Sequence, residues 1–321
     1  MAATAPLRIV FFGTPDFAVP SLDVLCLSRH PVVAVVTQPD RPRGRGQRTT
    51  DAPVKARAVE AGIPLLQPDR LKDPVFLDAL TELKADLGVV AAYGKILTDA
   101  VLAAPRLGLI NVHASLLPKY RGAAPVHRAI IAGETETGVT IMRVVKALDA
   151  GPMLAKATRP IEPDETSEVV ERDLARLGST LLASAIDGVS ENRIQETPQD
   201  DTAATYAHRL TKADGVIDWS ASARDVHNRI RGLHPWPHAY TFLKGRRCIL
   251  LRSSVISSDE AAPDSGTIIE AHGDSLIVAA GEGRLRILEM QAEGRRPMTA
   301  REFLAGHPMR VGDRFVAAAA A

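Results

Sequence analysis

Asn111 and His113 are the residues of this chain whose types and spacing best suit acyl-group chemistry. They lie near the end of an apolar run that begins at Gly108 and is short enough to be a buried strand. Because strand side chains alternate in direction, both project from one face, with Cα atoms about 6.6 Å apart at roughly 3.3 Å per residue. An amide that donates and accepts hydrogen bonds, beside an imidazole that exchanges protons near neutral pH, is suited to acyl transfer.

A carboxylate could complete this set. Asp149 lies in the loop A-L-D-A-G-P-M-L, which follows a strand predicted at 138–145. Delivered to the same sheet edge, it would orient His113 and favour the protonated ring. Taken alone, a histidine is more often a core or surface residue, and a loop aspartate is more often a turn residue.

The elements that must position these residues alternate between short apolar runs and helical patterns. This alternation predicts an α/β domain with a Rossmann-like, doubly wound sheet, whose ligands bind at the carboxyl ends of the strands. The pattern G-x-G-x-x-G is absent, which disfavours a nicotinamide-dependent dehydrogenase. Besides the run from Gly108, strands are expected at 7–12, 32–37, 64–66, 87–92, 138–145 and 153–161. Helices are expected up to 27 and 131, and at 54–61, 73–83 and 167–186.

The chain has 321 residues, enough for two domains of ordinary size. Residues 190–205 are polar and have the composition of a linker between a catalytic domain, 1–189, and a C-terminal domain, 206–316. The C-terminal domain is predicted to be an OB-like β-barrel, because short strand-like runs alternate with glycine turns. Its expected elements are a helix at 223–231 and strands at 247–254, 266–271, 275–280 and 284–292.

Charge is informative only locally, since 39 basic and 38 acidic residues nearly cancel. From Tyr206 to Arg252 there are 9 Lys or Arg and 3 Asp or Glu, an excess of 9 − 3 = 6 positive charges. A second basic segment is predicted to be an exposed, mobile loop whose best partner is a phosphate backbone. The alternative for both segments is a solvated face without a partner. The second segment contains four arginines in eight residues: Arg41, Arg43, Arg45 and Arg48.

The compartment and the absence of a metal can also be predicted. The two cysteines, Cys26 and Cys248, are too far apart in sequence to suggest a redox or metal pair. The N-terminus lacks the segments of a signal peptide, and no run of about 18 apolar residues occurs. His234 and His238 are spaced by four, but Pro235 and Pro237 exclude the helix that would align them on a metal. We therefore expect a cytoplasmic protein without a membrane span or a metal.

Several segments of both predicted domains resemble the methionyl-tRNA formyltransferase family. In the first domain these are F-x-G-T-P-D-F-A at 11–18, T-Q-P-D-R-P-x-G-R-G at 37–46, N-V-H-A-S-L-L-P-K-Y-R-G-A-A-P at 111–125, E-T-G-V-T-I-M at 136–142 and L-D-A-G at 148–151. In the second domain they are D-W-S at 218–220 and H-P-W-P at 234–237. The block at 111–125 is shared with the wider folate-dependent formyltransferases, whereas the arginine loop and D-W-S are typical of the tRNA enzymes.

The resemblance implies that a formyl group moves from the co-substrate 10-formyltetrahydrofolate to the amino group of methionyl initiator tRNA, for translation initiation. It implies Asn111, His113 and Asp149 as the catalytic set. An α-amino group is partly neutral near pH 7, so it can attack directly and form a tetrahedral intermediate. Asn111 would donate to the oxyanion, and His113 would stabilise it or relay the proton to the leaving nitrogen.

The same resemblance implies the binding residues. The folate is expected beside the S-L-L-P segment and the end of the strand at 87–92, where a flat pterin finds backbone hydrogen bonds and apolar walls. These residues are Ser115, Leu116, Leu117, Pro118, Tyr93 and Gly94. The tRNA is expected to contact the four arginines, with Arg45 the strongest candidate, and Lys212. We expect a monomer.

Two functions of other classes stay open at this point. One is a formyltransferase or hydrolase that acts on a small molecule, with a barrel that serves stability alone. The other is a non-catalytic RNA-binding protein that keeps an α/β scaffold. A serine hydrolase built on Ser115 and His113 is disfavoured, because the G-x-S-x-G nucleophile turn is absent.

Overall fold

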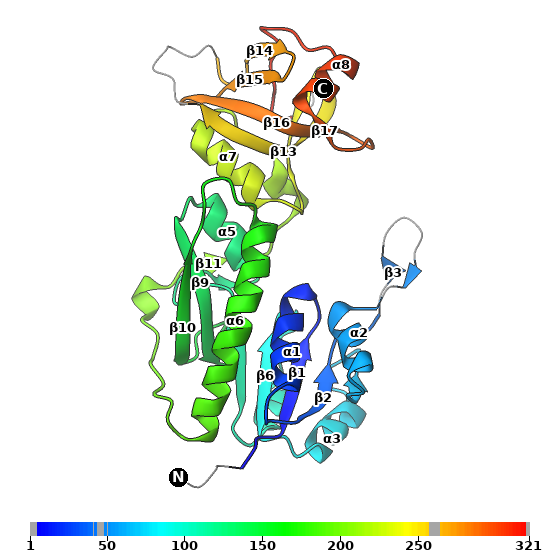
Figure 1. Cartoon of the computed structure of the whole chain (residues 1–321), viewed down its shortest axis with the longest axis vertical. Helices are drawn as coiled ribbons and strands as arrows, with labels where there is room; N and C mark the ends of the chain where they lie inside the picture. The colour runs from blue at the N-terminus through cyan, green and yellow to red at the C-terminus, as the bar shows by residue number, and fades with distance from the viewer. Residues whose placement is uncertain (1–4, 41, 44–47, 50, 257–263, 319–321) are drawn as a thin grey trace. The chain divides into compact units, whose positions relative to one another are not determined.

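The computed structural model describes residues 5–40, 42–43, 48–49, 51–256 and 264–318, with the backbone alone described at 42–43 and 48–49 (Figure 1). Two compact units are distinguished by their internal contacts. Unit 1 comprises Met1–Pro125, Thr137–Arg159 and Glu171–Ala207. Unit 2 comprises Val126–Glu136, Pro160–Val170 and His208–Ala321. Each unit is described by itself below.

Unit 1 is built on a seven-stranded sheet with the order β10-β9-β7-β6-β1-β2-β5. The strands are β1 Ile9–Gly13, β2 Val32–Val36, β5 Leu65–Leu66, β6 Leu87–Ala91, β7 Leu109–His113, β9 Glu136–Arg143 and β10 Met153–Pro160. Pairing is parallel from β7 through β6, β1 and β2 to β5, and antiparallel between β7 and β9. The predicted α/β domain with a mainly parallel sheet is confirmed.

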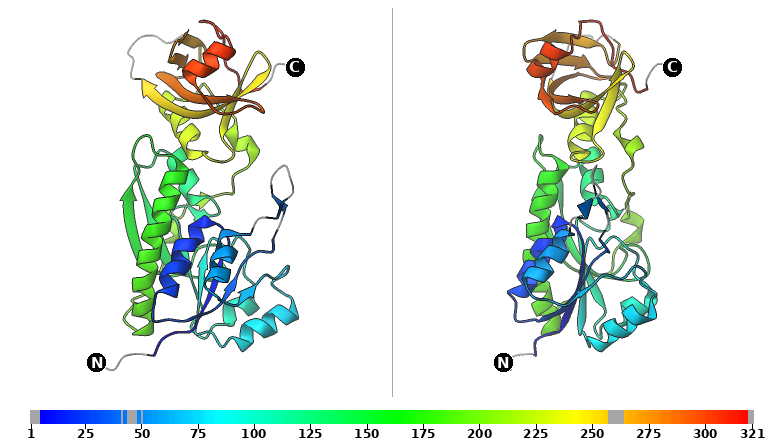
Figure 2. Two further views of the ribbon diagram at one scale, coloured as in Figure 1. Left: turned by 45° about the vertical axis from the view of Figure 1, so that its right-hand side comes forward. Right: turned by 90° about the vertical axis from the view of Figure 1, so that its right-hand side faces the viewer.

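Helices flank this sheet on both faces (Figures 1 and 2). They are η1 Asp16–Ala18, α1 Val19–Cys26, α2 Pro53–Glu60, α3 Pro74–Glu82, α4 Asp99–Ala103 and α6 Ser167–Ser190; a further helix, α5 Pro125–Ile131, follows β8 Arg121–Gly122 in the chain. The predicted helices are all present, and α6 continues four residues beyond its expected end. The short helix α4, which no sequence pattern indicated, begins where the Thr98 side chain accepts a hydrogen bond from the Val101 N–H at 3.4 Å. Most of α5 and the first turn of α6 belong to unit 2.

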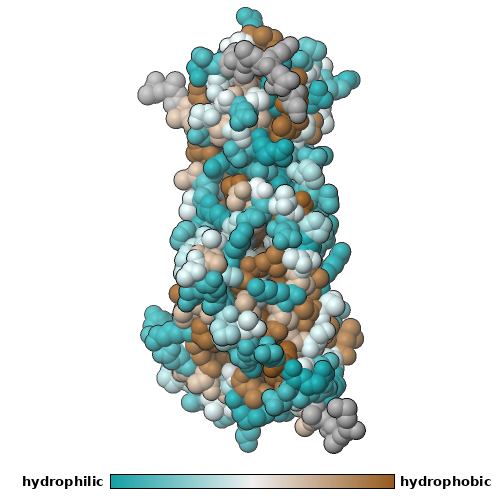
Figure 3. All heavy atoms as spheres, turned by 90° about the vertical axis from the view of Figure 1, so that its left-hand side faces the viewer, coloured by the Kyte–Doolittle hydropathy of each residue, from teal (hydrophilic) through white to brown (hydrophobic). Residues whose placement is uncertain are grey.

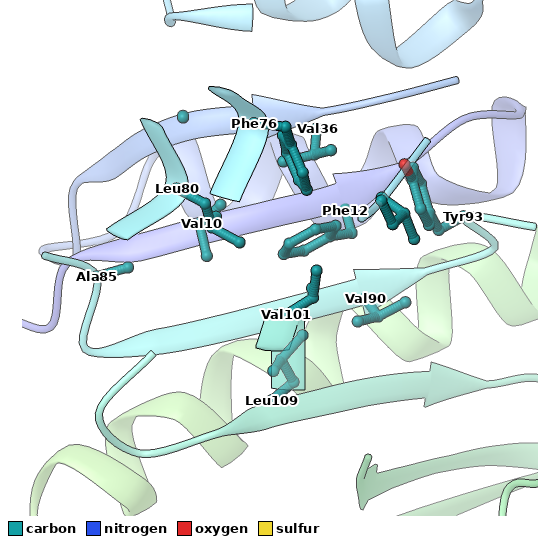
Figure 4. Close-up of a cluster of buried hydrophobic side chains, with 12 residues drawn as sticks. Val10, Phe12, Val36, Phe76, Leu80, Ala85, Val90, Tyr93, Val101 and Leu109 are labelled. Carbon is teal, nitrogen blue, oxygen red and sulfur yellow. The ribbon is translucent and has the colours of Figure 1, made fainter. Parts of the chain in front are cut away.

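The hydrophobic core of unit 1 explains why its central strands are apolar throughout. Strands β1 and β6 are buried at every position, as expected for strands that are covered on both faces. On one face, Phe12 and Tyr93 meet edge to face with ring centroids 5.6 Å apart, within a cluster that includes side chains of α3 and α4 (Figure 4). On the other face, α6 lies so close that a Cβ on Gly178 would meet Val112 at 2.8 Å.

These two faces determine which way the candidate residues of β7 point. Leu109 belongs to the cluster of Figure 4, whereas Val112 contacts α6. Because strand residues alternate, Asn111 and His113 share the face of Leu109. The predicted common direction of the two side chains therefore follows from the packing of their neighbours.

The basic segment at 41–48 differs in part from the loop predicted for it. Two short strands, β3 Pro42–Arg43 and β4 Arg48–Thr49, pair antiparallel as the base of a hairpin. Beside this base, Lys55 Nζ lies 2.5 Å from an Asp40 oxygen and 2.7 Å from an Asp51 oxygen. Lys55 therefore joins the two ends of the segment.

Residues 190–205, expected to be a linker, make defined contacts within unit 1. Thr197 pairs with Met153 in an antiparallel bridge, with N–O distances of 2.8 and 2.9 Å. After this segment, β11 Tyr206–Ala207 pairs with β8 Arg121–Gly122 in parallel. The assignment of separate functions to the domains on either side of this segment stays a prediction.

Unit 2 contains a six-stranded antiparallel sheet, as predicted for the C-terminal domain. Its order is β12-β13-β16-β15-β14, and β17 pairs with β16. The strands are β12 Ala239–Leu243, β13 Arg246–Ile256, β14 Ile268–His272, β15 Ser275–Ala279, β16 Arg284–Ala292 and β17 Met298–Thr299. The 3-10 helices η2 Asp201–Ala203 and η3 Lys212–Gly215 and the helices α7 Ala223–Gly232 and α8 Ala300–Gly306 complete the elements of the chain.

The C-terminal segment joins the two ends of this sheet. Val316 bridges Phe242 of β12, and Arg314 bridges Thr267, which precedes β14. Next to this closure, Trp219 of the D-W-S segment stacks on Phe315 with ring centroids 5.6 Å apart. The sheet is thereby curled towards closure, as a barrel requires. Strand β12 and helix α8 were missed by the sequence analysis.

Among the helices that the structure describes, none is both long and apolar enough to cross a bilayer. The face shown in Figure 3 intersperses hydrophilic and hydrophobic side chains.

Candidate active site

His113 lies at the carboxyl end of β7 and is 5% exposed. Its Nε2 is 3.0 Å from the carbonyl oxygen of Tyr120, and its Nδ1 is 3.7 Å from Oδ2 of Asp149. Both ring nitrogens therefore face oxygen atoms, the Tyr120 carbonyl within hydrogen-bonding distance and the Asp149 carboxylate beyond it. The structure thus brings together two of the three residues predicted to be catalytic.

Asp149 is held by the backbone opposite it. The same Oδ2 atom accepts a hydrogen bond of 2.8 Å from the N–H of Gly122. Asp149 itself has a φ of 47°, a left-handed conformation that is uncommon for a residue with a side chain. Gly122 has a φ of 122°, and a Cβ there would meet the Ala207 carbonyl oxygen at 2.7 Å. Only glycine fits at position 122. The backbone there can therefore take the conformation in which its N–H binds the Asp149 carboxylate.

Asn111 precedes His113 by two residues on the same strand face and is half-buried. Part of its side chain is therefore open to a ligand beside the imidazole. Across β7, its partners are Val90 of β6 and Met142 of β9. Its role as a donor to an oxyanion stays a prediction.

The S-L-L-P segment after β7 is held by one threonine. Thr140 is the β9 partner of His113; its hydroxyl donates to the Ser115 carbonyl at 2.7 Å and accepts from the Leu117 N–H at 3.1 Å. Ser115 and Leu117 are buried, each 1% exposed, whereas Leu116 and Pro118 are half-buried. The apolar surface that this segment offers to a ligand therefore comes from Leu116 and Pro118.

Ser115 is not arranged as an activated nucleophile. Its hydroxyl donates a 2.7 Å hydrogen bond to the Lys119 carbonyl, while the ring nitrogens of His113 face Tyr120 and Asp149. A serine nucleophile needs its hydroxyl within hydrogen-bonding reach of the base. This geometry argues against the serine hydrolase alternative.

Tyr93 and Gly94 follow β6 at the edge predicted for folate binding. The Tyr93 ring is 2% exposed within the core, and this burial raises the pKa of its hydroxyl to about 12. Its carbonyl oxygen accepts from Thr14 Oγ1 at 3.2 Å and from Gln38 Nε2 at 2.7 Å. Gly94 has a φ of 79°, which allows a sharp turn there. Because the ring is enclosed, a ligand would meet the backbone of this pair rather than the phenol.

The residues predicted to bind RNA are described only in part. Arg41 and Arg45 lie outside the described residues, and Arg43 and Arg48 are described by their backbone in β3 and β4. Lys212 begins η3 in unit 2 and is exposed. Their contacts with RNA stay predictions.

Three residues that support the site were missed by the sequence analysis: Arg121, Thr140 and Gln199. Arg121 and Thr140 lie inside segments that carry the family resemblance, so their position in the motif was a usable signal. Gln199 lies in the polar stretch interpreted as a linker, where composition gave no sign of a buried contact. Its partners became visible only in the folded chain.

Comparison with known proteins was consistent across both units. Residues 7–186 match the family model described as formyl transferase, and residues 209–308 match the formyl transferase C-terminal domain. Among solved structures, the sugar 3N-formyl transferase WlaRD has a TM-score of 0.68 at 17% identity, over 90% of this chain and 99% of that chain. The N-formyltransferase from Helicobacter canadensis has the same TM-score at 18% identity, over 89% of this chain and 99% of its own. At such identities these two structures establish the fold alone.

Curated relatives are much more similar. The methionyl-tRNA formyltransferase of Acetivibrio thermocellus is 46% identical over 307 residues, 96% of this chain and 99% of the relative. That of Methylobacillus flagellatus is 46% identical over 310 residues, again 96% and 99%. Because the identity extends across both units and the family models cover most of the chain, the chain belongs to the methionyl-tRNA formyltransferase family.

Proposed function

We propose that this protein transfers the formyl group of 10-formyltetrahydrofolate to the free amino group of methionyl initiator tRNA, for translation initiation. The observation that carries the proposal is 46% identity to a curated methionyl-tRNA formyltransferase over 96% of the chain. His113, with Asp149 at 3.7 Å from its ring, provides a site suited to this chemistry.

The reaction can be written on the residues of β7 and the Asp149 loop. The amine nitrogen attacks the formyl carbon, and the carbonyl electron pair moves to oxygen to give a tetrahedral intermediate. When that pair returns to re-form the carbonyl, the bond from carbon to the folate nitrogen breaks; the attacking nitrogen loses a proton and the folate nitrogen gains one. Asn111 donates to the oxyanion, a contact that is typically worth about 10²–10³ in rate. His113 relays the proton, which is typically worth about 10²–10⁴. Asp149 stabilises the positive charge of the protonated ring.

The residues at the carboxyl edge of the sheet support a folate site. Leu116 and Pro118 are half-buried and present apolar side chains, and Gly94 leaves its backbone open to a flat ring. Ser115, Leu117 and Tyr93 have buried side chains, so they would contribute through their backbone. The chemistry assigned to the folate is the supply of the formyl group and of a leaving nitrogen.

We assign the binding of the tRNA to the basic residues. Arg41, Arg43, Arg45, Arg48 and Lys212 would contact phosphates, whose binding to arginine and lysine is largely independent of sequence. The domain at 206–316 would bind the body of the tRNA, and the domain at 1–189 would carry out the transfer. The protein would act as a monomer.

Purified protein, 10-formyltetrahydrofolate and charged initiator tRNA test the proposal directly. We expect formylmethionyl-tRNA to form, with no product from uncharged tRNA. A dTDP-linked amino sugar serves as the small-molecule acceptor, because sugar N-formyltransferases share this fold. Faster formylation of the sugar than of methionyl-tRNA would overturn the proposal, and no turnover with either acceptor would favour a binding protein.

A further inference from the structure

Gln199 makes a set of hydrogen bonds that the assigned chemistry does not explain. Its side-chain Nε2 donates to the carbonyl oxygens of Asp149 and Gly151, both at 2.8 Å. Its Oε1 accepts from Nε and Nη2 of Arg121, at 3.0 and 2.8 Å. A side-chain amide has two donor hydrogens and two acceptor lone pairs, so Gln199 uses its full capacity.

These bonds hold the turn that presents the Asp149 carboxylate. Asp149 adopts a φ of 47°, which a residue with a side chain keeps only when its surroundings impose it. The Gln199 amide nitrogen donates to the carbonyl groups on both sides of Ala150. The loop therefore cannot change its backbone conformation there without breaking these two hydrogen bonds. The carboxylate position therefore depends on a residue fifty positions further along the chain.

The oxygen of the Gln199 amide binds the side chain of Arg121, a residue of the segment whose backbone contacts His113 and Asp149. Arg121, 4% exposed, lies between Tyr120, whose carbonyl faces His113 Nε2, and Gly122, whose N–H binds Asp149. The Arg121 guanidinium also binds Asp201 at 2.7 Å. The backbone N–H of Arg121 donates to the Thr205 carbonyl at 2.8 Å. Gln199 thus links the loop that carries the Asp149 carboxylate to the segment whose Tyr120 carbonyl faces the ring of His113.

We propose that Gln199 is a positioning residue for formyl transfer, which holds the Asp149 loop and the 120–122 segment at a fixed spacing around His113. This inference rests on the proposed function. The carboxylate oxygen and the ring nitrogen are 3.7 Å apart, so a small displacement decides whether the carboxylate acts on the imidazole. A misplacement of about 1 Å can cost roughly 100-fold in rate.

Two substitutions separate the contacts of Gln199. Gln199→Glu keeps an acceptor for Arg121 but places oxygen atoms against the carbonyls of Asp149 and Gly151. Gln199→Met keeps the length and removes all four hydrogen bonds. Gln195→Met is the matched control, because Gln195 is an exposed glutamine of the same segment. For both Gln199 variants we expect kcat to fall about 10- to 100-fold, with the KM values for folate and tRNA within about twofold of wild type and the control unchanged.

A double-mutant cycle distinguishes positioning from general stabilisation. If Gln199 acts through Asp149, adding Gln199→Glu to Asp149→Asn should lower kcat by less than about threefold beyond the single Asp149→Asn change. If instead the fold-decrease in kcat of the double variant equals the product of the two single fold-decreases, Gln199 acts independently of Asp149. That result would overturn the proposal. If the Gln199→Met variant does not fold, the double-mutant cycle with Gln199→Glu still tests whether Gln199 acts through Asp149.

An NMR measurement provides a readout besides activity. The ring-nitrogen shifts of His113 should change in Gln199→Glu and stay as in wild type in Gln195→Met. Unchanged His113 signals together with a kcat within about twofold of wild type would refute the positioning role. If the wild-type protein does not formylate methionyl-tRNA, the proposed function fails, whereas the His113 signals still report whether Gln199 positions the Asp149 loop.

Discussion

Asp149 Oδ2 lies 3.7 Å from Nδ1 of His113. The two residues are thirty-six positions apart in the chain: His113 is the last residue of β7, and Asp149 lies in the loop between β9 and β10. The distance is within ion-pair range but longer than a hydrogen bond. An effect of Asp149 on the ring would therefore come mainly from its charge.

Replacing the imidazole or the amide should reduce turnover without loss of donor binding. We expect His113→Ala and Asn111→Ala each to lower kcat by about 100-fold or more, because both side chains act on the transition state. Folate binding, measured by fluorescence titration, should stay close to wild type. A loss below about tenfold in kcat for His113→Ala would argue against proton transfer by this residue.

Asp149→Asn should keep the hydrogen bond from the Gly122 N–H and remove the charge next to His113. Asparagine lacks the negative charge that would stabilise the positive charge which the ring carries when it holds the transferred proton. We expect a lower kcat with the KM values close to wild type. A wild-type kcat would mean that Asp149 and His113 are not coupled during catalysis.

Serine at all four of Arg41, Arg43, Arg45 and Arg48 should abolish tRNA formylation and leave 10-formyltetrahydrofolate binding close to wild type. Each phosphate contact contributes roughly −0.7 to −0.9 to the slope of log affinity against log salt. The slope of tRNA binding, measured by filter binding across a salt series, should therefore flatten. If the four-serine variant formylates methionyl-tRNA at the wild-type rate, the segment at 41–48 is a solvated surface that does not bind tRNA.

Lys55→Met should weaken tRNA binding by removing the link between Asp40 and Asp51, the two ends of the arginine segment. Hydrogen bonding to Lys55 lowers the pKa of Asp40, so the contact persists at neutral pH and is lost as the pH falls through that lowered value. Because the acidic partners are partly exposed, we expect a rise in the KM for tRNA of only about two- to fivefold. Lys72→Met, at an exposed lysine, is the control and should leave this KM unchanged.

His127 should make the protein less stable in mild acid. Burial lowers the pKa of His127 from 6.5 to about 4. Between these two pH values the histidine is protonated in the unfolded chain but neutral in the folded chain. Stability should therefore fall as the pH drops from 6.5 towards about 4, by on the order of 1–3 kcal/mol. Urea unfolding of His127→Gln should show a smaller fall. His272→Gln, at an exposed histidine, should behave as wild type.

Local patterns were sufficient to predict most elements of the fold. The buried strands β1 and β6 are continuous apolar runs, and the helices α2, α3 and α6 begin within one or two residues of the predicted positions. Such segments are long or periodic enough for their own residues to determine their type. Strand β12 was missed because it follows H-P-W-P, where two prolines favour a loop, and α8 because its seven residues are too short to show a period.

The sequence by itself determined the family, because the family depends on short motifs that the chain carries; the catalytic roles of Asn111, His113 and Asp149, inferred from the same motifs and from strand periodicity, stay predictions. The sequence did not reveal that the Tyr93 ring belongs to the core, or that the Ser115 hydroxyl donates to Lys119. Only the tertiary structure decided that Gln199, from a polar segment with a linker's composition, binds both Arg121 and the Asp149 loop. The physical reason is that these hydrogen bonds join residues 48 to 78 positions apart, and neither partner carries a local signal of the other.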